Sequence, residues 1–233
     1  MKDLLIIDLE TSGTDPDADH VVEVGAVLFS TSLAVPLACK SALVLSGANA
    51  AELVNGIPAA SLTGPWCIAP EQIRPMIAGL AKLAPEPPIY VAHNAAFDRS
   101  FLPGVGAEWI CTYGDATWPR MPGETGSLVN IALAYGLGVS RAHRAIEDCL
   151  LLAALLGRVH EVEGGLEQWM FRALEPKREL IACVSYDDRE LAKHAGFRWD
   201  GERKVWAKRV GESRAAAFCE GLPFRVDGAR EAA

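Results

Sequence analysis

Residues 4–11 read LLIIDLET, an apolar run that ends in two carboxylates. Together with the apolar residues 21–29, which follow a Gly/Asp/Pro turn, this run predicts two paired strands. Side chains two apart on a strand point to the same face, so Asp8 and Glu10 project together. Two adjacent carboxylates raise each other's pKa unless a cation lies between them, and hard divalent cations such as Mg²⁺ take oxygen ligands. Asp8 and Glu10 are therefore candidate metal ligands, although an isolated Asp-x-Glu is more often a solvated strand end.

The rest of the first 163 residues alternates between strand and helix patterns. Further strands are expected at residues 33–37, 42–45 and 89–92. Helical periodicity is expected at residues 71–83, 128–135 and 144–156, with Pro70 as a start signal and Gly157 as an end signal. Strands first, followed by strand–helix alternation, predict a mixed α/β sheet flanked by helices.

The composition changes near residues 163–165, after which Lys, Arg and Trp become more frequent. We expect a first domain at 1–163, a connecting helix or linker at 164–177, and a small α+β domain at 178–228. Within this part a helix is expected at 166–175, a strand at 180–185 and a helix at 187–195. A hairpin is expected to join 197–199 to 204–206 around Asp200-Gly201, a dipeptide that favours turns with positive φ.

Charge and cysteine usage limit the class of protein. The net charge is −8, but residues 1–165 hold 9 basic and 18 acidic residues, whereas residues 166–233 hold 13 and 12. The acidic surplus therefore lies in the first part, where bound metal can balance carboxylates, although nucleic-acid binders usually carry a basic footprint. The six cysteines are scattered, and no signal or membrane segment is evident. We expect reduced thiols in a soluble, cytoplasmic protein without a membrane partner.

Two further segments carry acids and histidines: HNAAFD at residues 93–98 and HRAIED at residues 143–148. Asp98 follows the strand 89–92 and would lie in the first turns of a following helix. The alternative to a catalytic role is an aspartate that the helix dipole favours at a helix start. His143 and Asp148 are five residues apart, about 140° around a helix, so they would not share a face. With Asp148 on the helix and His143 on the segment before it, the imidazole could act as a general base; a capping or surface histidine is the alternative.

The ordered set Asp8/Glu10, Asp98 and His143/Asp148 resembles the DEDD exonuclease superfamily over roughly residues 3–160. It is similar to the histidine branch (DEDDh), which includes the proofreading epsilon subunit of bacterial DNA polymerase III, exonuclease X, ribonuclease T and oligoribonuclease. The tyrosine branch has a tyrosine four residues before the final aspartate, where this chain has Arg144.

The resemblance implies a ribonuclease-H-like sheet and two divalent ions, Mg²⁺ or Mn²⁺. Asp8, Glu10 and Asp148 would hold the catalytic ion. Asp8 would also bridge to the second ion, which Asp98 would support, and His143 would deprotonate the attacking water. Thr11 and Asn94 fall where family members touch the terminal nucleotide; Asn94 could equally be a structural cap.

The C-terminal part also resembles a small bacterial module found as an accessory on DNA-processing proteins, marked by a Trp-Asp turn followed by Lys-x-Trp. Basic residues interleaved with aromatics can bind single strands by charge and stacking. The alternative is that Trp199 and Trp206 form a cross-strand pair in the core of a tiny domain. The candidate phosphate contacts are Arg198, Arg203, Lys204 and Lys208.

The leading hypothesis is a 3′→5′ exonuclease that releases nucleoside 5′-monophosphates from DNA, with a polymerase or repair complex as a candidate partner. An exoribonuclease of the same branch is the alternative, because the 2′-OH is recognised by residues outside the motifs. A non-catalytic protein that binds nucleic-acid ends would be expected to have lost carboxylates, and none is lost here. The oligomeric state stays open.

Overall fold

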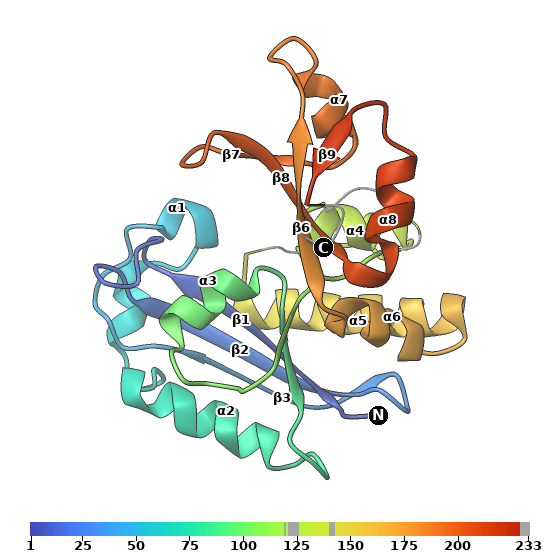
Figure 1. The fold of residues 1–233 in the computed structure, drawn as a ribbon. Helices are drawn as coiled ribbons and strands as arrows, with labels where there is room; N and C mark the ends of the chain where they lie inside the picture. Colours follow the sequence, from blue (N-terminus) through green and yellow to red (C-terminus); the bar gives the residue numbers. More distant parts are fainter. Residues whose placement is uncertain (119, 121–125, 140–142, 229–233) are drawn as a thin grey trace. The chain divides into compact units, whose positions relative to one another are not determined.

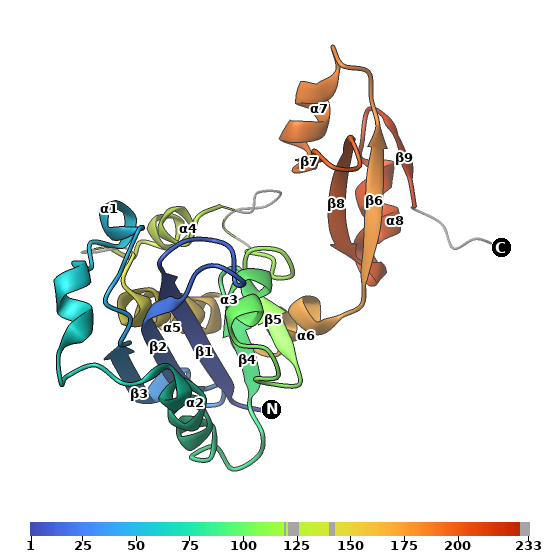
Figure 2. The same ribbon diagram turned by 90° about the vertical axis from the view of Figure 1, so that its left-hand side faces the viewer.

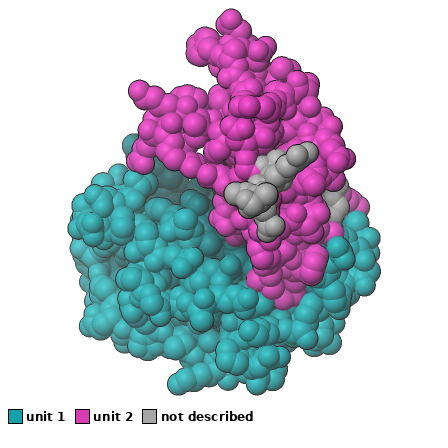
Figure 3. All heavy atoms as spheres, viewed as in Figure 1, with its two compact units in different colours: residues 1–113, 126–168 teal, residues 114–125, 169–233 magenta. Residues whose placement is uncertain are grey.

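The computed structural model describes residues 1–118, 120, 126–139 and 143–228. The chain forms two compact units, residues 1–113 with 126–168 and residues 114–125 with 169–233 (Figure 3). We refer to these as unit 1 and unit 2. Residues 114–125 thus group with the C-terminal part, although they precede unit 1's last two helices in sequence.

Unit 1 is built on a mixed sheet flanked by helices, as the sequence predicts, and this sheet has five strands (Figure 1). Its strands are β1 (Leu4–Thr11), β2 (Val21–Ser30), β3 (Val35–Leu43), β4 (Ile89–Ala92) and β5 (Trp109–Cys111). The strand order is β3-β2-β1-β4-β5, with β1–β2–β3 antiparallel and β1–β4–β5 parallel. All ten residues of β2 are buried, as expected for a central strand covered on both faces.

The helices of unit 1 cover both faces of this sheet. They are α1 (Glu52–Asn55), α2 (Ile73–Ala81), α3 (Ala95–Phe101), α4 (Leu128–Ala134) and α5 (Ala145–Glu163), with 3₁₀ turns at Ala59–Thr63 and Pro70–Gln72. Helix α2 packs on the face that carries Leu9 and Val24. Helix α5 packs on the opposite face, where its first residues closely approach Gly25 of β2 (Figure 2). Gly25 is the register partner of Asp8, so Asp8 also faces α5.

Two local predictions for unit 1 were wrong, and one strand was missed. The segments 33–37 and 42–45 form one strand, Val35–Leu43, because β3 pairs with β2 along its whole length. Gly157 does not end the last helix, which continues to Glu163 and ends at Gly164 with φ 72°. A single helical glycine costs only about 1 kcal/mol, and the burial of Val159 in the next turn offsets that cost. Strand β5 was not predicted, because three residues carry too little periodicity.

Unit 2 contains a four-stranded antiparallel sheet in the order β7-β8-β6-β9. Its strands are β6 (Lys177–Cys183), β7 (Arg198–Asp200), β8 (Val205–Gly211) and β9 (Arg225–Asp227), and its helices are α7 (Arg189–His194) and α8 (Glu212–Glu220). Helix α6 (Glu167–Leu174) precedes β6. The core of the sheet is a small cluster that includes Leu180, Phe197 and Val210. Helix α8 and strand β9 were not predicted from the sequence.

The hairpin β7–β8 forms where the sequence predicts it, but its turn differs. Asp200 pairs with Val205, so the loop has four residues, and the positive φ of 55° falls on Lys204 rather than on Gly201. Asp200 closes this loop, because its Oδ1 accepts the backbone N–H groups of Glu202 (3.0 Å) and Arg203 (2.9 Å). The longer turn is thus stabilised by an aspartate side chain, which a two-residue turn would not need.

Candidate active site

Three carboxylates meet at the end of β1. Asp8, Glu10 and Asp148 each offer an oxygen, and these oxygens all lie within 4.8 Å of one another. Asp8 and Glu10 reach this point because they share one face of β1, and Asp148 reaches it from the first turn of α5. Residues separated by about 140 positions in the chain therefore form one oxygen-lined group on the α5 side of the sheet.

Asp98 is the fourth acid, and it is buried on α3 with 3% of its surface exposed. Burial raises the pKa of Asp8 well above its ordinary value. Among the neighbouring charges, Asp98 adds most to this rise, followed by Asp148. The structure thus brings together all four acids that the sequence singles out, three within ligand distance and Asp98 beside Asp8.

The electrostatics of the four acids fit a bound cation. Burial raises the pKa of Glu10 to about 7, and Asp148 and Glu23 contribute to the rise. Burial likewise raises the pKa of Asp98 to about 7 and raises that of Asp148. Carboxylates whose ionised forms are this unfavourable are stabilised by a divalent cation, and oxygen is the donor that Mg²⁺ and Mn²⁺ prefer. The chemistry of this set therefore suits a metal centre.

His143 lies on the segment just before α5, as the spacing to Asp148 predicts. It is exposed and has φ 61°, a left-handed conformation that is uncommon for residues other than glycine. Its backbone N–H donates to Oδ2 of Asp148 at 3.1 Å, which ties the histidine backbone to the group of acids. Residues with such backbone strain cluster at functional sites, where the surrounding structure holds them in place.

The two candidate nucleotide contacts, Thr11 and Asn94, differ in exposure. Thr11 is buried and its hydroxyl donates to the carbonyl of Gly13 at 2.6 Å. Its own carbonyl accepts a hydrogen bond from Asn55 Nδ2 at 3.3 Å. Asn94 is exposed at the start of α3, and its side chain makes no capping hydrogen bond, so the structural-cap alternative is not supported.

Sequence reasoning missed three residues that shape the site. Glu23 is a buried acid in β2 that pairs with Arg144, the residue next to His143. Gly25, also in β2, leaves room for the start of α5. An acid and a glycine inside an otherwise apolar strand were the available signals, because both are unfavourable there without a specific reason.

In unit 2 the two tryptophans of the hairpin differ in environment. Trp199 and Trp206 are register partners with ring centroids 5.7 Å apart, which agrees with the cross-strand pair. Trp206 packs against the core cluster, whereas Trp199 is 53% exposed. Only Trp206 therefore has the role of a core residue, and Trp199, on the edge strand β7, presents its ring to solvent.

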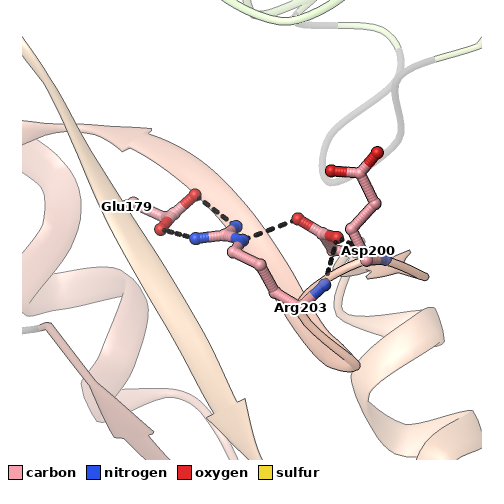
Figure 4. A network of polar contacts seen from close by, with 4 residues as sticks. Glu179, Asp200 and Arg203 are labelled. Carbon is pink, nitrogen blue, oxygen red and sulfur yellow. Dashed lines mark hydrogen bonds and ion pairs between the residues drawn. The ribbon is translucent and has the colours of Figure 1, made fainter.

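The four candidate phosphate contacts in this unit also differ. Arg203 makes a bidentate ion pair with Glu179 at 2.7 and 2.8 Å and a further one with Asp200 at 2.6 Å (Figure 4). Lys208 donates to the carbonyl of Ala195 at 2.9 Å, and burial lowers its pKa. Arg198 and Lys204 are exposed. Arg203 and Lys208 are thus engaged within the protein and are weaker candidates for phosphate contact.

Among the helices that the structure describes, none has the length and apolar character needed to cross a bilayer.

Comparisons with known proteins can now be set beside this geometry. Residues 178–229 match the family described as "Domain of unknown function (DUF8626)". Exodeoxyribonuclease 10 of Escherichia coli (strain K12) is 39% identical over 88 residues, which cover 35% of this chain and 39% of that protein. The match thus spans about two fifths of that relative's length. The PolC-type DNA polymerase III of Thermotoga petrophila is 29% identical over 169 residues, 68% of this chain and 12% of the polymerase.

Solved structures agree with these relatives. Exonuclease X in complex with 5′-overhanging duplex DNA superposes with a TM-score of 0.56 at 29% identity, covering 72% of this chain and 96% of that one. The zinc-bound complex of E. coli exonuclease I with single-stranded DNA gives a TM-score of 0.59 at 16% identity, covering 83% and 50%, and this likeness concerns the fold alone. In sequence and in fold, this chain is similar to the exonucleases of the DEDD superfamily.

Proposed function

We propose that this chain is a metal-dependent 3′→5′ exonuclease that hydrolyses DNA from its 3′ end and releases nucleoside 5′-monophosphates. One observation carries the proposal: Asp8, Glu10 and Asp148 place oxygens within 4.8 Å of one another. Asp98 adjoins this group, and His143 is tied to it through Asp148. The similarity to exodeoxyribonuclease 10 and exonuclease X supports DNA as the substrate.

The acids would hold two divalent ions, Mg²⁺ or Mn²⁺. Asp8, Glu10 and Asp148 would bind the catalytic ion, while Asp8 and Asp98 would support the second. When bound, a pair of such cations stabilises both the attacking and the leaving oxygen of an in-line displacement at phosphorus.

His143 would act as the general base. From the exposed segment before α5, the imidazole would take a proton from a water molecule beside the acids. The hydrogen bond from its backbone to Asp148 keeps the ring near the group that binds the metal. Thr11 and Asn94 would orient the terminal nucleotide.

The proposal assigns the two parts of the chain different tasks. Residues 1–163 would form the exonuclease domain, 164–177 the connection, and 178–228 an accessory module whose Trp199, Arg198 and Lys204 contact nucleic acid. A polymerase or repair complex is the proposed setting, and the similarity to a PolC-type polymerase supports it.

The test is release of label from 3′-labelled and 5′-labelled oligonucleotides in Mn²⁺, with DNA and RNA of the same sequence in parallel. Wild type is expected to release a labelled mononucleotide from 3′-labelled DNA, and the 5′ label is expected to stay on progressively shorter strands. Asp8→Ala should abolish release, and His143→Ala should slow it by about 10²- to 10⁴-fold, the usual contribution of a general base. Asp17→Ala removes an exposed acid from the neighbouring loop and is the matched control.

The assignment fails if Asp8→Ala degrades DNA as fast as wild type. Faster release from RNA than from DNA would favour the exoribonuclease alternative. Tight binding of 3′ ends without any product in Mg²⁺ or Mn²⁺ would instead indicate a non-catalytic end-binding protein.

A further inference from the structure

A fifth acid lies beside the metal-binding group without belonging to it. Glu23 of β2 is the register partner of Glu10 in β1, so their side chains leave the same face of the sheet. Glu23 is only 2% exposed. Like charges directly opposite one another on antiparallel strands are destabilising, and Glu23 indeed raises the pKa values of both Glu10 and Asp8. A buried acid at this position needs a partner that offsets its charge.

Arg144 is that partner. Its Nε donates to Glu23 Oε2 at 2.8 Å and its Nη2 donates to Oε1 at 2.6 Å, the two-pronged geometry that suits guanidinium and carboxylate. The backbone N–H of Ala145 also donates to Oε2 at 3.0 Å. Both oxygens of Glu23 are therefore engaged, which separates Glu23 from the three acids whose oxygens lie within 4.8 Å of one another.

These contacts fix the start of α5, where two site residues are anchored. Arg144 precedes the first residue of the helix, and its carbonyl accepts the backbone N–H of Asp148 at 3.0 Å. His143 stands immediately before Arg144 and holds a left-handed backbone conformation that needs support from its surroundings. Glu23 thus binds Arg144, the residue that lies between the proposed base, His143, and the helix that carries Asp148.

We propose that Glu23 and Arg144 form a positioning pair that sets the turnover rate and the divalent-cation affinity of the site. The pair holds His143, the neighbour of Arg144, beside the acids, and its two charges cancel, so the cation meets only the remaining acids. This inference rests on the proposed exonuclease function for its kinetic part, whereas the part on cation affinity can be measured without DNA.

The pair predicts effects of opposite sign on cation affinity. Glu23→Gln leaves the guanidinium unpaired beside Glu10 and should weaken Mn²⁺ binding about tenfold, a typical effect of changing a group that supports metal ligands. Arg144→Gln leaves the carboxylate unpaired and should tighten Mn²⁺ binding about threefold, because one more negative charge faces the cation. The double variant has the same net charge as wild type and should bind Mn²⁺ with nearly wild-type affinity.

Turnover should respond differently. Both single variants and the double variant lose the two-pronged contact, so kcat in saturating Mn²⁺ should fall about 10- to 100-fold in all three, with KM for DNA little changed. Recovery of cation affinity without recovery of kcat in the double variant is a pattern that general destabilisation does not produce.

The experiment uses the full-length chain. Mn²⁺ binding is measured without DNA by the loss of the electron paramagnetic resonance signal of free Mn²⁺. The kcat and KM values are measured by release of label from 3′-labelled single-stranded DNA. Thermal unfolding checks that each variant is folded. Arg158→Gln, which breaks an exposed ion pair with Glu161 on the same helix, is the control and should match wild type.

Equal Mn²⁺ affinity in wild type and all variants, or equal weakening in both single variants, would overturn the role in cation affinity. A kcat within about twofold of Arg158→Gln in the single variants would overturn the positioning role, since such support usually contributes tenfold or more. If wild type releases no nucleotide but the Mn²⁺ series shows the opposite shifts, the proposed function fails while the charge pairing stands.

Discussion

Replacing Gly25 by alanine tests whether the close approach of α5 to β2 builds the site. Gly25 is the register partner of Asp8, and a Cβ added there would lie 2.5 Å from the carbonyl carbon of Ala145 and 2.6 Å from the amide nitrogen of Ile146. These are backbone atoms, which cannot swing aside as a side chain can. Ordinary contact begins at 3.4 Å, so the start of α5 must retreat by about 0.9 Å.

The displacement acts on the chemistry, because His143 and Asp148 move with the start of α5. A misplacement of about 1 Å can cost about 10²-fold in rate, and we expect a loss of that size in kcat for Gly25→Ala. Overpacking costs about 1–3 kcal/mol, so the melting temperature should fall by several degrees while the chain still folds.

The assay compares kcat for release of label from 3′-labelled DNA at saturating Mn²⁺ with the melting temperature of each variant. Gly79→Ala is the matched control, because Gly79 lies within α2 and an added Cβ would meet only Lys40 Nζ at 3.7 Å. That control should keep wild-type activity and gain about 0.5–1 kcal/mol of stability from higher helix propensity. Wild-type kcat in Gly25→Ala would refute the idea that this glycine positions the helix.

Three further outcomes are expected. The pKa of Glu10 is raised to about 7 in the cation-free fold, so between about pH 4.5 and pH 7 the folded chain holds a proton that the unfolded chain releases. The free energy of unfolding of wild type relative to Glu10→Gln, measured by chemical denaturation in EDTA, should therefore fall as pH rises over that range. A rise over the same range would contradict this. Phe197→Ala removes a buried ring from the core of unit 2 and should lower the free energy of unfolding of that unit by about 3–5 kcal/mol. Calorimetry should show the unit unfolding at a lower temperature, and an unchanged thermogram would show that the ring is dispensable. Lys204→Ala should reduce the salt dependence of single-stranded DNA binding by about one phosphate contact. Lys208→Ala should leave it unchanged, because the Lys208 amine donates to a backbone carbonyl. Equal salt slopes for wild type and Lys204→Ala would exclude the Lys204 contact.

Several features of the site follow from the sequence because they depend on local geometry. Side chains alternate along any strand, so Asp8 and Glu10 share a face whatever surrounds them. The strand Ile89–Ala92 is bounded by prolines and by polar residues, and the structure has it at the predicted residues. The five-residue spacing of His143 and Asp148 excludes a shared helical face, and the structure places His143 before α5.

Tertiary structure decided the rest. The partner of Glu23 is Arg144, 121 residues further along the chain, and neither residue carries a local signal of the other. Gly25 matters only because a helix from the far end of unit 1 packs against it. Gly157 remains inside α5 since packing on the sheet offsets its low helix propensity. Propensity and periodicity act over a few neighbouring residues, so the sequence by itself determined the strand and helix settings of the candidate acids and histidine, and their order along the chain carries the family resemblance. Their distances, raised pKa values and supporting ion pair come from contacts between distant segments, which only the folded chain defines.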